Sequence, residues 1–81
     1  MKVELFNNEV NIKGRRKIQG NDIEQYILDL AMYANLDLVS NEYSGKGDQF
    51  YSITFHGTND KLYGFMIMVQ NVSVDAHYTI A

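Results

Sequence analysis

The sequence contains no cysteine and no proline, and it has no apolar run of ten or more residues. The absence of cysteine excludes disulfide bonds and thiolate metal sites. The N-terminus is charged and polar, so we expect neither a signal peptide nor a membrane-spanning segment. Together these absences predict a soluble protein of the cytoplasm.

The length predicts one domain, 1–81, because 81 residues are too few for a second core. Hydrophobic residues make up 46% of the chain, with six tyrosines and four phenylalanines among them, which is enough apolar material for a folded core. A domain this small buries about 60% of its unfolded surface, so we expect a free energy of unfolding of about 5 kcal/mol unless the protein oligomerises.

The charges are distributed unevenly along the chain. Residues 1–19 contain five Lys or Arg against two Glu, whereas residues 20–81 contain two Lys against eight Asp or Glu. Four of the seven basic residues form a run within five positions: Lys13, Arg15, Arg16 and Lys17. This polarity can steer association with a charged partner without identifying that partner.

The N-terminal part predicts a hairpin followed by a helix. Residues 2–6 and 9–13 alternate apolar with polar side chains, and Asn7-Asn8 between them suits a tight turn. A helix is predicted over about 22–34 from apolar residues at helical spacing: Ile23, Ile27, Leu30 and Ala34. Asn21 is placed as its N-cap and Asn35 as a left-handed C-cap.

The remainder is predicted as strands over 36–43, 49–56, 62–69 and 72–80, joined by a polar loop at 44–48 and turns at 57–60 and 70–71. The predicted fold class is α+β, a single helix packed on an antiparallel sheet in the order ββαββββ. Ile53 and Phe65 are expected to pair across strands. The full predicted core is Ile23, Ile27, Leu30, Ile53, Phe55, Phe65 and Ile67.

Few residues suggest catalysis. His56 and His77 fall on the polar phases of their strands, which indicates solvated histidines and not metal ligands. Gly45-Lys46-Gly47 has the composition of a phosphate-binding loop, but it joins two predicted strands and opens no helix, so a hairpin loop is the better interpretation. We predict no catalytic residue, no metal site and no cofactor.

The basic run has two interpretations. Clustered cations displace counterions from phosphates, and Phe50 and Tyr43, if they lie on the sheet face away from the helix, would add stacking platforms for single-stranded nucleic acid. Alternatively, the run is a solvated loop or docks on an acidic protein surface, which the acidic remainder of the chain favours. The acidic residues could themselves imitate a phosphate backbone, although their density is ordinary and a solvated surface is the simpler interpretation.

Apolar residues exceed what one helix can cover. Leu28 and Met32 fall on the outer side of the predicted helix, and the reverse face of the strand 62–69 carries Leu62, Met66 and Met68. Methionine adapts to varied shapes and suits a partner surface. We expect either that the N-terminal hairpin covers the second sheet face or that this face is an interface.

These observations favour a non-enzymatic binding protein. In size, composition and lack of catalytic motifs the chain is similar to the small inhibitors that phages and mobile elements encode against host enzymes, anti-CRISPR proteins among them. The absence of proline and the abundance of Asn, Asp, Lys, Ile and Tyr are typical of an AT-rich genome, such as that of a phage or a low-GC bacterium.

The similarity implies a protein that blocks or modulates a host protein or nucleoprotein complex in the cytoplasm. From the apolar residues on the outer side of the helix we expect that the protein self-associates as a homodimer or binds a partner there. The expected contacts are Lys13, Arg15, Arg16, Lys17, Leu28 and Met32. The alternative is a small nucleic-acid-binding regulator that uses the run from Lys13 to Lys17.

Overall fold

The computed structural model describes residues 1–16, 23–72 and 77–80. Over these residues the elements follow the order ββαββαβ. They are β1 (Lys2–Phe6), β2 (Glu9–Arg15), α1 (Ile23–Tyr33), β3 (Asp37–Ser44), β4 (Phe50–His56), α2 (Asn59–Val72) and β5 (His77–Ile80). The α+β class is confirmed. The single helix and the order ββαββββ are wrong, because α2 occupies residues predicted as a strand.

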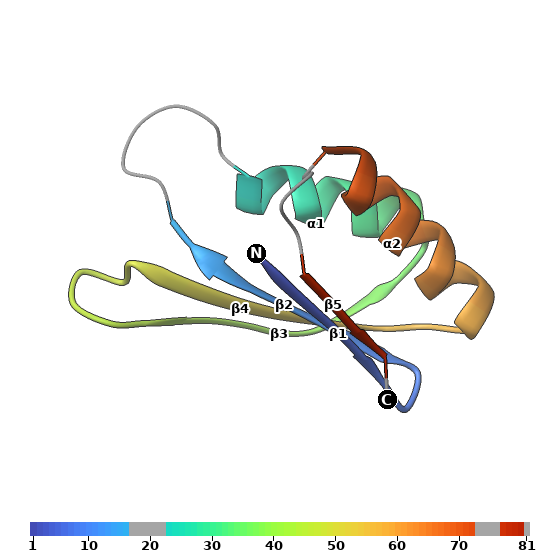
Figure 1. The fold of residues 1–81 in the computed structure, drawn as a ribbon, viewed down its shortest axis with the longest axis horizontal. Coiled ribbons are helices and arrows are strands. Elements are labelled where there is room, and N and C mark those ends of the chain that lie inside the picture. Colours follow the sequence, from blue (N-terminus) through green and yellow to red (C-terminus); the bar gives the residue numbers. More distant parts are fainter. Residues whose placement is uncertain (17–22, 73–76, 81) are drawn as a thin grey trace.

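The strands form one sheet in the order β3-β4-β2-β1-β5. The pairs β3–β4, β4–β2 and β2–β1 are antiparallel, whereas β5 runs parallel to β1. Both helices lie on the same face of this sheet (Figure 1). We call the other side the open face, because no helix of the described chain covers it. In β1, β2 and β4 the side chains alternate, so every second residue points to the core and the others lie on the open face.

The predicted N-terminal hairpin is confirmed. Lys2 pairs with Lys13 and Phe6 with Glu9 in an antiparallel register. Asn7 and Asn8 connect the strands with φ angles of 52° and 61°. Both values lie in the left-handed region that a tight hairpin turn requires and that asparagine tolerates.

The helix α1 is confirmed over its described residues. Its predicted cap, Asn21, lies outside them, as does Asp22. At the other end Asn35 has a φ of 60°, and the Leu36 N–H donates to the Ala31 carbonyl at 2.9 Å. This is the left-handed C-cap that the sequence predicts, and it satisfies a carbonyl that the helix leaves without an internal partner.

The helix α2 replaces the strand predicted over 62–69, the turn predicted at 70–71 and the second half of the turn predicted at 57–60. Its buried residues recur at helical spacing: Leu62, Phe65, Met66 and Val69. The strand prediction came from the alternation of Tyr63, Phe65, Ile67 and Val69. Phe65 and Val69 also belong to the buried side of the helix, so this short apolar run is compatible with either a strand or a helix. The Leu62 N–H donates to the Thr58 carbonyl at 3.0 Å, which places the first turn directly after Thr58.

The last predicted strand is shorter than expected. Val72 ends α2, and β5 confirms the strand only over 77–80. Residues 73–76 lie outside the described residues.

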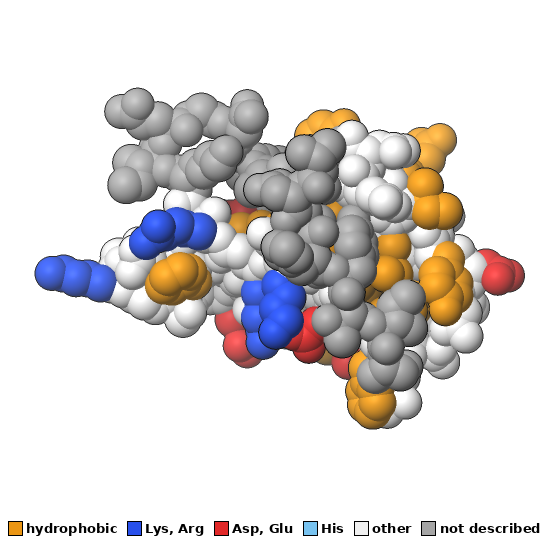
Figure 2. Space-filling view, in the orientation of Figure 1, with side chains coloured by type: hydrophobic (Ala, Val, Ile, Leu, Met, Phe, Trp, Pro, Cys, Tyr) orange, Lys and Arg blue, Asp and Glu red, His pale blue; other side chains and the backbone are white. Residues whose placement is uncertain are grey.

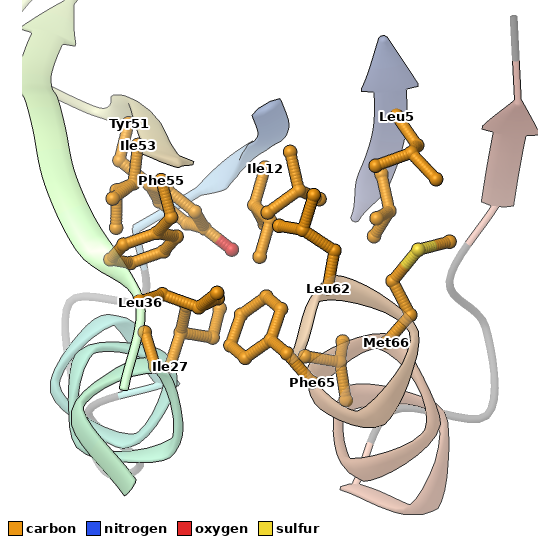
Figure 3. Close-up of a cluster of buried hydrophobic side chains, with 14 residues drawn as sticks. Leu5, Ile12, Ile27, Leu36, Tyr51, Ile53, Phe55, Leu62, Phe65 and Met66 are labelled. Carbon is orange, nitrogen blue, oxygen red and sulfur yellow. The ribbon is translucent and has the colours of Figure 1, made fainter. Parts of the chain in front are cut away.

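The core is a single layer between the sheet and the two helices (Figure 3). Phe55 of β4 and Phe65 of α2 meet edge to face, with ring centroids 5.4 Å apart. Ile27 and Ile53 are also buried, as predicted. The predicted cross-strand pairing of Ile53 with Phe65 is wrong, because Phe65 reaches the core from a helix.

Two other predicted core residues depart from the expectation. Leu30 is only partly buried against the core. Ile67 is 60% exposed, because helical geometry turns it away from the sheet when Phe65 points inward. The side chain of Ile23 lies outside the described part of the structure.

Candidate binding surfaces

The basic run begins on the sheet. Lys13 and Arg15 lie two residues apart on the open face of β2, and both are exposed. Gly14 between them faces the core, where a Cβ would lie 2.4 Å from the hydroxyl oxygen of Tyr51. A glycine at this position therefore lets β2 continue to Arg15. Lys17 lies outside the described residues.

Arg16 is engaged by its own chain. Its Nε donates to Glu24 Oε1 at 2.7 Å, and its guanidinium lies 4.4 Å from the ring centroid of Tyr43. The Tyr43 hydroxyl donates to Glu24 Oε2 at 3.0 Å, so Tyr43 lies on the helix side of the sheet. The expectation that Tyr43 faces away from the helix is wrong. These contacts join the residue after β2 to α1 and β3. The role of Arg16 as a contact to a partner stays a prediction.

Tyr51 lies beside this cluster. Burial raises the pKa of the Tyr51 hydroxyl above its usual value of 10.0, and the negative charge of Glu24 raises it further. The hydroxyl is therefore protonated at neutral pH and contributes no charge to its surroundings.

The basic end of the open face contains a shallow cavity of about 750 Å³ that is widely open to solvent. Its lining consists of three basic residues, two aromatic residues, two serines, a methionine and a glycine: Lys2, Lys13, Arg15, Phe50, Tyr51, Ser44, Ser52, Met1 and Gly14. No acidic residue of the described chain lines it. The Arg15 guanidinium lies 5.7 Å from the ring centroid of Phe50. We call this feature the basic cavity.

The middle of the open face is polar. The Asn11 side-chain amide donates to Ser52 Oγ at 3.0 Å and to Thr54 Oγ1 at 2.9 Å. The Asn11 Oδ1 atom is buried and has no hydrogen-bond partner among the described residues. The N-terminal hairpin belongs to the sheet, so the expectation that it covers the second face is wrong. Leu62, Met66 and Met68 belong to α2 and not to this face, and the face as an interface stays a prediction.

The apolar residues lie differently from the prediction. Leu28 is partly buried against the core, so its expected position on the exposed outer side of the helix is wrong. Leu62 and Met66 are buried because α2 presents them to the sheet. Met32 is 74% exposed, as predicted.

Met32 belongs to a group of exposed apolar residues that the sequence pattern did not identify. Tyr33, Leu38 and Val39 are each more than half exposed and follow Met32 through the end of α1 into β3. We call these four residues the α1–β3 surface. In Figure 2 most hydrophobic side chains on the visible face lie over the helical end of the molecule, whereas the basic ones lie toward the β3–β4 loop.

In the described part of the chain, the residues considered for catalysis form no metal-binding cluster. His56 is exposed at the end of β4, as predicted, and the side chain of His77 is outside the described part. Gly45 and Gly47 have positive φ angles of 82° and 70° in the β3–β4 connection, which is the predicted hairpin loop. Within the described residues no three His, Cys, Asp or Glu side chains are placed to hold a metal ion.

Comparison of the chain with protein-family models, curated proteins and solved structures found no match. Neither helix of the described chain is long and apolar enough to cross a membrane. The α1–β3 surface and the basic cavity are the two candidate binding surfaces of the described chain.

Proposed function

We propose that the protein is a non-enzymatic binding protein that blocks or modulates a host protein or nucleoprotein complex, in the manner of small phage-encoded inhibitors. The observation that carries this proposal is the α1–β3 surface. Its four apolar side chains occur within eight consecutive positions, and each is more than half exposed. Single exposed apolar residues are ordinary, but a local group of them is typical of a surface that a protein partner covers.

The position of β3 supports the same role. β3 lies at an edge of the sheet, so the backbone groups on its outer side have no strand partner in the described chain. Edge strands are commonly protected by lysine, proline or short length, and β3 has eight residues with neither lysine nor proline. A bulge between Leu38 and Ser40 leaves residues 40–44 as the regular part of this edge.

A partner could therefore pair with the regular edge and cover the apolar side chains beside it. Strand addition supplies backbone hydrogen bonds, and each large apolar side chain that becomes fully buried contributes about 1.5 to 3 kcal/mol. Leu28 is not part of this contact, because it already packs against the core.

The test is affinity capture from a low-GC bacterial lysate with three immobilised proteins. They are the wild type, the variant Met32→Lys/Val39→Lys, and the control Tyr63→Lys/Ile67→Lys. The control places the same two charges at exposed apolar positions of α2. We expect one host protein or complex to bind the wild type and the control but not the first variant, and its activity to fall when the free protein is added. Equal capture by all three proteins would contradict the proposal.

Sedimentation of the purified chain tests the homodimer. If a second copy occupies the α1–β3 surface, the wild type and the control sediment as dimers and Met32→Lys/Val39→Lys as a monomer. A wild-type monomer at every concentration assigns the surface to a different protein.

A nucleic-acid-binding regulator is the second candidate, and the exposed Lys13 and Arg15 favour it. Neither forms an ion pair with the described residues. Binding through them would weaken steeply with salt, and each lost phosphate contact would lower the slope of log affinity against log salt by about one. Glu4 and Glu9 share the open face and would repel an extended strand.

A further inference from the structure

The basic cavity has the size and composition of a small ligand site. Its volume of about 750 Å³ lies within the range of pockets that hold small molecules. Lys13 and Arg15 are about 7 Å apart along β2, as alternate residues of a strand are. Lys2 is the direct neighbour of Lys13 on β1. Three cations on one small surface repel one another, so an anion placed between them is stabilised by all three.

Lys13 and Arg15, which form no ion pair with the described residues, suit a phosphate group. Arg15 carries a planar guanidinium that can form two parallel hydrogen bonds to phosphate oxygens, and Lys13 adds a mobile ammonium group. Lys2 pairs with Glu4 at 3.2 Å, but its side chain is 61% exposed. A surface ion pair of this kind contributes little and can rearrange around a stronger anion.

Acidic residues limit the size of the anion. Glu4 lies beside Lys2, and Glu42 lies directly across from Ser52 on the neighbouring strand. A chain of phosphates that continued in either direction would approach one of these carboxylates. A terminal phosphate, which concentrates its charge in one group, stays between the cations.

The wall of the cavity suits an aromatic ring attached to that phosphate. Phe50 is 41% exposed, and the Arg15 guanidinium lies beside its ring. A nucleobase can stack on the phenyl ring or on the guanidinium plane. Ser44 and Ser52 add hydroxyl groups that can bond a sugar.

We propose that the basic cavity binds a terminal phosphate carried by a nucleoside. The ligand comes either from a free nucleotide or from the 5′-phosphorylated end of a nucleic-acid strand. The proposal is independent of the protein-binding function, because it concerns a different surface.

The test is a titration of the ¹⁵N-labelled protein, followed by NMR, with nucleotides, the matching nucleosides and short strands with a 5′-phosphate or a 5′-hydroxyl. The variant is Lys13→Ala/Arg15→Ala, and the control is Lys46→Ala/Lys61→Ala, which removes the same charge from exposed positions elsewhere. All four side chains are exposed, so we expect both proteins to fold. Phe50→Leu tests the stacking wall.

We expect saturable binding of phosphorylated ligands, with shifts centred on β2 and the start of β4. Affinity should fall at least about tenfold in Lys13→Ala/Arg15→Ala, as for the loss of one charge-assisted hydrogen bond, and should change little in the control. Phe50→Leu should weaken the binding of nucleotides but not of inorganic phosphate, which is titrated in parallel as a ligand without a base. Tighter binding of the 5′-phosphorylated strand than of free nucleotides identifies a strand end as the source, and the reverse identifies a free nucleotide.

Three results would overturn the proposal. They are no saturable binding of any phosphorylated ligand at millimolar concentration, equal losses in the variant and the control, and binding of nucleotides and 5′-phosphorylated strands no tighter than that of the matching nucleosides and 5′-hydroxyl strands.

Discussion

Truncating Leu62 and Ile67 separately to alanine tests whether α2 is a helix packed as described. Both changes remove the same number of carbon atoms, and the two residues lie on the same element. Leu62 is 0% exposed and contacts the core under the sheet (Figure 3). Ile67 is 60% exposed on the outer side of α2.

The expected costs differ severalfold. Leu62→Ala leaves a cavity in a closely packed layer and should destabilise the fold by about 2 to 5 kcal/mol. Ile67→Ala loses less than half of the burial of one side chain, about 1 kcal/mol, and the higher helix propensity of alanine returns part of it. We expect a net change of about half a kcal/mol or less for Ile67→Ala.

Urea unfolding followed by circular dichroism measures both changes. With a total stability of about 5 kcal/mol and a slope of about 1 kcal/mol per molar urea, Leu62→Ala should lower the midpoint by about 2 M or more, or leave the chain largely unfolded in buffer. Ile67→Ala should unfold close to the wild type. A strand over 62–69 would point Ile67 inward and Leu62 outward, so a larger loss for Ile67→Ala would refute the helical packing.

Two further predictions concern the polar groups around Glu24. Because the pKa of Tyr51 is raised, the folded state holds this proton more tightly than the unfolded state does, so its contribution to stability is intact below about pH 10 and declines as pH rises through the folded pKa. Absorbance titration should show one tyrosine that ionises late, and Tyr51→Phe should remove both this step and part of the alkaline loss; unchanged titration would contradict the burial of its hydroxyl. Arg16→Ala should cost about 1 to 2 kcal/mol, less than a buried pair would, because the Arg16 side chain is 43% exposed. In a double-mutant cycle with Glu24→Gln the two changes should be coupled, and additive losses would show that the ion pair contributes nothing.

The features that were predicted correctly from the sequence are local: each is determined by residues that are close together along the chain. The turn at Asn7-Asn8, the C-cap at Asn35 and the β3–β4 loop each require φ values that asparagine, aspartate or glycine adopts with little strain. The alternation of β4 and the helical spacing of α1 extend over enough residues to identify one period. The same reasoning found Met32 as exposed and Lys13 and Arg15 as accessible cations.

The candidate surfaces could be predicted only in part. Lys13 and Arg15 are evident from composition, but Lys2 and Phe50 join them through the pairing of β2 with β1 and β4. The exposure of Leu38 and Val39 follows from the position of β3 at the edge of the sheet. Strand order is a long-range property that no local pattern contains, so Lys2, Leu38 and Val39 carried no signal of their own. Phe50 was expected as a stacking platform from the alternation of its strand.

The sequence by itself determined the class of fold, the N-terminal hairpin, α1 and its cap, because these follow from local backbone preferences and long amphipathic patterns. Only the tertiary structure decided that residues 59–72 form a helix, that Arg16 pairs with Glu24, and that three cations border one cavity. The physical reason is that Leu62, Phe65 and Met66 gain their burial by covering the sheet as a second helix, and the free energy of that packing outweighs the weak preference of a short apolar run for either period.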